Sequence, residues 1–142
     1  MGLFQKEPSV KIERVVIYTD GASKGNPGPG AIGAVIQDRK GRLVTCISQA
    51  IGIATNNQAE YKALIAALEK SIRLGIKQAE IRSDSEWLVK QINGQYRVKA
   101  TLIIPLHQRA TELLGQLESF TITHIPREEN AAADKLANAA LK

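Results

Sequence analysis

Cysteine, aromatic residues and long apolar runs are all scarce in this sequence of 142 residues. The single cysteine, Cys46, excludes an intrachain disulfide and a metal site built from several thiolates. No apolar run approaches the roughly 20 residues that span a bilayer, and the first residues lack the apolar stretch of a signal peptide. These absences point to the cytoplasm and away from a membrane partner.

Acidic residues are fewer than basic ones, 14 against 19, so the net charge is +5 and the pI is near 9.5. A basic protein suits a polyanionic partner without requiring one. The lysines and arginines are scattered, so the fold would have to assemble any nucleic-acid-binding surface. The length and the hydrophobic content of 44% predict one globular domain over residues 1–142, with a flexible leader at about 1–10.

Hydrophobic periodicity predicts three strands followed by strands that alternate with helices. The predicted strands cover residues 10–19, 31–36, 43–53, 79–83 and 120–125. The predicted helices cover residues 56–74, 87–92, 104–117 and 126 to the C-terminus. The second of these helices is expected to place Trp87 on its apolar face. This order indicates an α/β fold in which helices cover a mixed sheet.

The segment after the first strand, at residues 21–30, is rich in glycine and proline. Such a loop has little side-chain bulk and many exposed N–H groups, so a phosphate or another backbone can approach it closely. Asp20 stands at the mouth of the strand beside this loop and is a candidate metal ligand. The same pattern also fits a hairpin turn with an Asx-type aspartate.

Four carboxylates fall where two predicted elements meet. Asp20 and Asp84 each end a strand, and parallel strands bring such ends to the sheet edge where open α/β folds bind ligands. Glu60 falls in the first turn of a helix and Asp134 near the start of the last one. Simpler explanations remain open, because Asp84 could cap a helix and the other two could favour helix dipoles. If the four converge, divalent cations would relieve their repulsion.

Four sequence blocks, in order, resemble those of the ribonuclease H type 1 family. They are YTDGASKGNPGPG at 18–30, TNNQAEY at 55–61, SDS at 83–85 and RxxNxxxDxLA at 127–137. The resemblance covers residues 12–141 and implies the ribonuclease H-like fold, a five-stranded mixed β-sheet flanked by α-helices. It implies an endonuclease that hydrolyses the RNA strand of RNA·DNA hybrids and leaves 5′-phosphate and 3′-hydroxyl ends.

The resemblance also implies a two-metal-ion site. By this resemblance Mg²⁺ ions, with Mn²⁺ as a substitute, are held by Asp20, Glu60, Asp84 and Asp134. One ion would activate the attacking water and the other would stabilise the leaving 3′-oxygen. All four residues offer the oxygen ligands that such hard ions require.

A further set of residues is implied in binding the hybrid, and its members are Ser23, Gly25, Asn26, Thr55, Asn57 and Glu86. The first three match a loop that touches the RNA strand through the minor groove, where a 2′-hydroxyl can be sensed. Thr55 matches a residue that grips a DNA phosphate, and Asn57 one that spans both strands. Glu86 falls where relatives carry a polar residue that contacts RNA. Helix capping alone would also explain residues 55–57.

The sequence departs from the family pattern in three places. Residues 95–104 are too few for the basic protrusion of some bacterial relatives, and nothing at the N-terminus resembles the hybrid-binding domain of eukaryotic ones. The loop before the last helix carries Arg127 where some relatives place a mobile histidine that aids product release. His124 is close by but falls in the predicted strand, where packing would explain it. We expect Arg127 to contact the cleaved phosphate instead.

Three other functions compete with the hybrid-specific endonuclease. The fold could serve a transposase- or resolvase-like DNA nuclease, a catalytically weak or dead nucleic-acid-binding module, or a domain of a reverse transcriptase. The Gly-Asn-Pro-Gly loop and the Asn-Gln-Ala-Glu block argue against the first, and the four carboxylates argue against the second. The prediction is therefore a monomeric enzyme whose partner is an RNA·DNA hybrid.

Overall fold

The computed structural model describes residues 11–141, so the predicted leader at 1–10 lies outside the described residues. The strands are β1 (Arg14–Ser23), β2 (Gly28–Gln37), β3 (Leu43–Ala54), β4 (Gln78–Ser83) and β5 (Ser119–His124). The helices are α1 (Asn56–Arg73), α2 (Glu86–Ile92), α3 (Ile104–Leu114) and α4 (Ala131–Ala140), and the 3₁₀ turn η2 (Arg127–Asn130) precedes α4. The predicted order of elements is confirmed.

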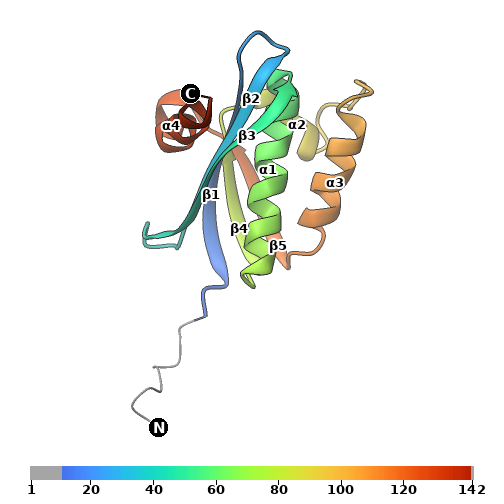
Figure 1. Cartoon of the computed structure of the whole chain (residues 1–142). Coiled ribbons are helices and arrows are strands. Elements are labelled where there is room, and N and C mark those ends of the chain that lie inside the picture. The colour runs from blue at the N-terminus through green and yellow to red at the C-terminus, as the bar shows by residue number, and fades with distance from the viewer. Residues whose placement is uncertain (1–10, 142) are drawn as a thin grey trace, which may run out of the picture.

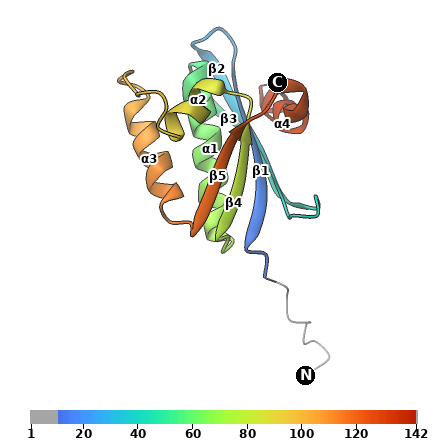
Figure 2. The same ribbon diagram turned by 180° about the vertical axis from the view of Figure 1, so that it is seen from behind.

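The five strands form one mixed sheet in the order β3-β2-β1-β4-β5. β1, β2 and β3 pair antiparallel in sequence, whereas β4 runs parallel to both β1 and β5. The parallel pairs require long crossover connections, which α1 supplies between β3 and β4, and α2 with α3 between β4 and β5. In both views α1, α2 and α3 cover one side of the sheet and α4 lies on the other (Figures 1 and 2).

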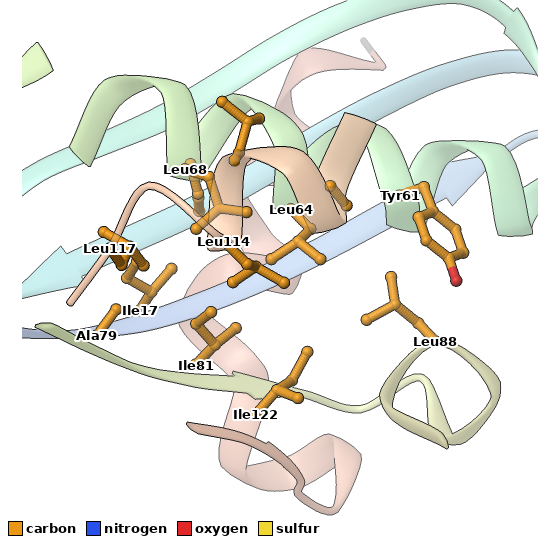
Figure 3. Close-up of a cluster of buried hydrophobic side chains, with 14 of the residues drawn as sticks. Ile17, Tyr61, Leu64, Leu68, Ala79, Ile81, Leu88, Leu114, Leu117 and Ile122 are labelled. Atoms are coloured by element: carbon orange, nitrogen blue, oxygen red, sulfur yellow. The ribbon is translucent and has the colours of Figure 1, made fainter. Parts of the chain in front are cut away.

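The main core lies between the parallel strands and α1. Ile17, Ile81 and Ile122 are in register on β1, β4 and β5, and each is at most 5% exposed. Leu64 and Leu68 of α1 lie above this row and are fully buried (Figure 3). Burying a side chain of this size contributes about 1.5–3 kcal/mol, so the row fixes the parallel strands relative to α1. It thereby fixes where those strands end.

The start of α1 is set by a capping box. Thr55 Oγ1 accepts a hydrogen bond from the backbone N–H of Gln58 at 3.1 Å, and the Gln58 side chain accepts from the Thr55 N–H at 2.8 Å. Two N–H groups that have no partner within the helix are satisfied in this way. The N-cap predicted within residues 55–57 is therefore confirmed at Thr55, and it determines where Glu60 falls on the helix.

Close contact of α4 with the sheet depends on Gly33 of β2. A Cβ at Gly33 would lie 2.2 Å from the Ala133 carbonyl oxygen and 2.6 Å from the Ala137 nitrogen. Both alanines are fully buried. The backbone of α4 therefore rests directly on β2, because no side chain at position 33 holds it away.

Several predicted boundaries were wrong, most of all around the glycines. β1 continues through Ser23 and β2 begins at Gly28, so only residues 24–27 form the turn. Asp20 therefore lies inside β1 and not at its end. The extension occurs because this hairpin keeps pairing as far as Ser23 with Gly30. At its other end β1 begins at Arg14, where the parallel partner β4 also begins.

The boundaries of the third and fourth helices also differ slightly from the prediction. The third ends at Leu114 and not at Leu117, and residues 127–130 form a 3₁₀ turn before α4 instead of a continuous helix. Within residues 11–141 no helix combines the length and apolarity needed to cross a membrane.

Gly33→Ala should lower the free energy of unfolding by about 1–3 kcal/mol, because the added methyl group must displace α4 backbone. Gly115→Ala is the matched control, since a Cβ there meets its nearest atoms at 3.4 and 3.5 Å. The control should be neutral or stabilised by about 0.4–1 kcal/mol. Chemical denaturation of both variants measures the difference. Equal stability of the two would contradict the close contact of α4.

Candidate functional site

Two aspartates stand side by side where the parallel pairing of β1 and β4 stops. The last pair in this register is Thr19 with Ser83, so Asp20 and Asp84 follow directly on neighbouring strands. The prediction that the two carboxylates share one sheet edge is confirmed, although β1 continues beyond it to pair with β2. Asp84 is not the cap of α2, because Ser85 Oγ accepts the hydrogen bond from the Leu88 N–H.

Glu60 reaches the same point from α1. A Cβ at Gly21 would lie 2.2 Å from the carbonyl carbon of Ala59 and 2.4 Å from the nitrogen of Glu60, so the helix backbone touches β1 here. The Gly21 N–H donates to Glu60 Oε1 at 3.2 Å. Oxygen atoms of Asp20, Glu60 and Asp84 all lie within 4.8 Å of one another. Glu60 is the fifth residue of α1, so its predicted place in the first turn was wrong.

Asp134 approaches from the opposite face of the sheet. It lies in the first turn of α4, as predicted, and it lines the same cleft as Asp20, close enough to raise the pKa of the Asp20 carboxyl group. The side chain of Asn138, one turn later, donates to Asp134 Oδ1 at 3.1 Å. All four predicted carboxylates therefore converge, three as a compact triad and Asp134 beside Asp20.

Mutual repulsion and burial perturb these carboxyl groups. Burial, followed by the charge of Asp84 and the contact with Asp134, raises the pKa of Asp20 to about 8, against an opposing effect of Arg127. Burial and the charges of Asp20 and Asp84 also raise the pKa of Glu60 well above its ordinary value. The cluster thus holds protons near neutral pH unless a cation replaces them. An all-oxygen donor set fits a hard divalent cation.

The carboxylates line a cleft of about 710 Å³. Among the residues predicted to act on substrate, those that line it are Ser23, Asn57, Glu86 and Arg127. The others, Gly25, Asn26, Thr55 and His124, do not line this cleft. His124 is the last residue of β5, as its predicted strand position requires, but its side chain is exposed and not packed in the core.

Two of the loop residues hold the turn against the start of α1. Ser23 Oγ donates to the Ala54 carbonyl oxygen at 2.6 Å, and Asn26 Oδ1 accepts from the Asn56 N–H at 2.9 Å. Ser23 therefore keeps only acceptor capacity toward a ligand, whereas the Asn26 amide keeps its two N–H donors. These bonds fix the loop beside the carboxylates.

A second groove adjoins the cleft and was not predicted. It has a volume of about 490 Å³, shares Asn57 and Trp87 with the cleft, and is also lined by Tyr96, Arg97 and Lys99. The Trp87 and Tyr96 rings lie 4.9 Å apart. Trp87 is 58% exposed, so its predicted place on the buried face of a helix was wrong. The apolar spacing was misleading because α2 is short and its buried contacts come from Leu88 and Val89.

The chain is similar over most of its length to proteins described as ribonucleases H. A protein-family model described as "Reverse transcriptase-like" matches residues 18–140. The chain is 47% identical to ribonuclease HI of Halobacterium salinarum over 128 residues, which are 90% of this chain and 64% of that protein. The crystal structure of RNase H1 from this archaeon matches with a TM-score of 0.88 and is covered to 97%.

Two further relatives are similar over the same region. The bifunctional protein Rv2228c of Mycobacterium tuberculosis is 42% identical over 90% of this chain and 35% of its own length, and the structure of its N-terminal RNase H domain has a TM-score of 0.88. LC11-RNase H1, isolated from compost and solved in complex with an RNA/DNA hybrid, is 42% identical with a TM-score of 0.85. That match covers 89% of this chain and 96% of the solved one. The chain thus spans only part of the curated relatives, 64% and 35% of their lengths.

Asp20→Asn should reduce the loss of stability that metal-free protein suffers as pH rises. The folded-state pKa of about 8 lies above the ordinary value of 3.8, so the folded chain binds this proton more tightly than the unfolded chain. The resulting stabilisation is full below about pH 3.8 and is lost as pH rises through 8. Denaturation in the presence of a chelator, across a pH series, measures it.

Asp38→Asn is the control for this experiment. Hydrogen bonds from the Arg42 and Lys40 N–H groups lower the pKa of half-buried Asp38, so its contribution has the opposite sign and is lost as pH falls. An unchanged stability profile between pH 4 and 8 in Asp20→Asn would show that Asp20 is not the buried titrating group.

Proposed function

The chain belongs to the ribonuclease H type 1 family, and we propose that it is an endonuclease that hydrolyses the RNA strand of RNA·DNA hybrids. The observation that carries this proposal is the convergence of four carboxylates in a cleft that Ser23 and Asn57 also line. The hybrid seen with LC11-RNase H1 supports the choice of substrate. We also propose that the enzyme acts as a monomer in the cytoplasm.

The proposed reaction needs two divalent cations, Mg²⁺ with Mn²⁺ as a substitute, held by Asp20, Glu60, Asp84 and Asp134. When bound, they supply an activated water and stabilise the leaving 3′-oxygen, which yields 5′-phosphate and 3′-hydroxyl ends. The chain's own part is to hold these oxygen atoms at short, fixed spacing. The raised pKa values of Asp20 and Glu60 show how costly that arrangement is without a cation.

Specificity for RNA is proposed to come from the loop beside the cleft. The Ser23 hydroxyl donates its proton to the Ala54 carbonyl oxygen, so toward a ligand it can only accept a hydrogen bond. A ribose 2′-hydroxyl can donate that bond, and a DNA strand has no such group. The free N–H donors of Asn26 and the backbone of Gly25 would contact the same strand. Glu86, which is paired with Lys90 at 2.8 Å, lines the cleft where the RNA would pass.

The DNA strand is proposed to lie in the second groove. Asn57 lines both the cleft and the groove, as a residue that spans two strands should. Trp87 and Tyr96 offer aromatic surface for sugar or base, and Arg97 and Lys99 offer charge for phosphate. Thr55 Oγ1 accepts a hydrogen bond as the helix cap, so its own proton remains available to a DNA phosphate.

Asp84→Asn should lower hybrid cleavage by more than about 100-fold while hybrid binding survives. Changing a residue behind a metal ligand already costs about 10–100-fold, and here the ligand itself becomes a neutral amide. The variant should also melt slightly higher in metal-free buffer, because a repelling charge is gone. Cleavage of hybrid, duplex RNA and duplex DNA is assayed in parallel across a Mg²⁺ series.

Asp38→Asn, in the exposed turn between β2 and β3, is the control and should cleave normally. Wild-type rates in Asp84→Asn would contradict the metal site. Equal cleavage of duplex DNA and hybrid by the wild type would favour the DNA nuclease instead, and binding without cleavage would favour the inactive module.

Arg127 is proposed to assist turnover by contacting the cleaved phosphate from the rim of the cleft. Arg127→Ala should lower steady-state kcat by about tenfold, the equivalent of one charge-assisted hydrogen bond. It should neither add nor remove a titration near pH 6–7, because a guanidinium stays protonated there. His124→Ala should do less. The test compares pH–rate profiles of both variants under single and multiple turnover; loss of a neutral titration in His124→Ala would reverse the roles.

A further inference from the structure

One buried amide, that of Asn130, joins the elements that carry the carboxylates. Its side chain is 1% exposed at the junction of η2 and α4. Its Nδ2 donates to the Thr19 carbonyl oxygen at 2.9 Å and to Asp84 Oδ2 at 3.4 Å. Thr19 directly precedes Asp20, and Asp134 follows Asn130 by four residues. The amide is thus bonded directly to Asp84 and to the residue that precedes Asp20, and it lies one helical turn before Asp134.

The two contacts determine which way the amide faces and which chemistry position 130 requires. Both partners are oxygen acceptors, so the NH₂ group must point at them, and each of its protons has one partner. A hydroxyl has one proton to offer and a carboxylate has none. A lysine would add a positive charge at the cluster. Within this set only a neutral amide supplies two donors without changing the charge of the site.

The oxygen atom of the same amide makes no hydrogen bond. Within residues 11–141, Asn130 Oδ1 is buried and has no hydrogen-bond partner. A buried polar atom without a partner opposes folding, so an apolar side chain of similar size would avoid that cost. The contribution of Asn130 therefore lies in what its two donors hold.

We infer that Asn130 is a positioning residue whose NH₂ group holds Asp84 Oδ2 and the end of the parallel part of β1 at the spacing that metal binding needs. The inference rests on the metal site of the proposed function. Asn130 acts through Asp84 and is not itself a ligand. Groups that orient a metal ligand typically contribute about 10–100-fold to metal affinity.

The test measures Mn²⁺ binding by calorimetry on the whole chain, with Asn130→Leu as the main variant. Leucine removes both donors and also the orphaned oxygen, but it takes one donor away from the Thr19 carbonyl oxygen, so metal-free melting should fall only modestly. Mn²⁺ affinity should fall about 10–100-fold. In cleavage assays, half-saturation should move to higher Mn²⁺, and excess Mn²⁺ should recover much of kcat. Asn130→Ala, which is smaller, replaces the leucine variant if that one does not fold.

Ser71→Ala is the matched control for loss of a buried polar group. Ser71 is fully buried, and its Oγ has no hydrogen-bond partner within residues 11–141. It follows Glu60 by eleven residues on α1, which is about 16 Å along the helix. Its Mn²⁺ affinity should equal that of the wild type.

The outcomes separate the inference from the function on which it rests. If the wild type binds no Mn²⁺, the proposed metal site is wrong. If the wild type binds Mn²⁺ and the Asn130 variants bind it equally well, only the positioning role is wrong. If affinity falls only in proportion to lost thermal stability, Asn130 is a structural residue and the inference is overturned.

Discussion

Repulsion among carboxylates that share one end of the sheet is the constraint on which this structure depends. Asp20, Glu60 and Asp84 place oxygen atoms within 4.8 Å of one another, and Asp134 lines the same cleft. Such a cluster opposes folding unless the scaffold around it is stable enough to hold it. The buried row of Ile17, Ile81 and Ile122 beneath α1 supplies that support (Figure 3). A bound cation would offset this repulsion.

Two glycines let helices from opposite faces reach the same edge. Gly21 admits the backbone of α1 and so brings Glu60 to Asp20, whereas Gly33 admits α4 and so brings Asp134. Gly33 pairs with Asp20 in the β1–β2 register, and Gly21 is the next residue along β1, so the two glycines face opposite sides. The site is therefore assembled through the sheet. The helices α1 and α4, which lie on opposite sides of it (Figures 1 and 2), each add one carboxylate to the two that follow the end of the β1–β4 pairing.

The surface around the site separates two kinds of contact. The loop held by Ser23 and Asn26 offers hydrogen-bonding groups that suit a ribose, while the groove at Trp87 and Tyr96 offers aromatic surface and positive charge. Asn57 lies where the two meet. An RNA strand and a DNA strand would then be distinguished because the surfaces on the two sides of Asn57 differ in chemistry. The groove carries two basic residues, Arg97 and Lys99, in a sequence whose lysines and arginines are otherwise scattered.

The sequence alone determined the order of elements and the helix cap at Thr55, because periodicity and capping are local properties. It indicated that Asp20 and Asp84 share a sheet edge only on the condition that their strands pair in parallel, and the fold supplies that pairing. The tertiary structure decided that the glycine-rich segment continues as strand, that Trp87 is exposed, and that Asn130 bridges β1 and Asp84. A local pattern shows that a residue is small, apolar or polar. Whether a helix backbone covers Gly21 and Gly33, whether anything packs on Trp87, and which atoms face the Asn130 amide depend on segments distant in the chain, and only the folded arrangement brings these together.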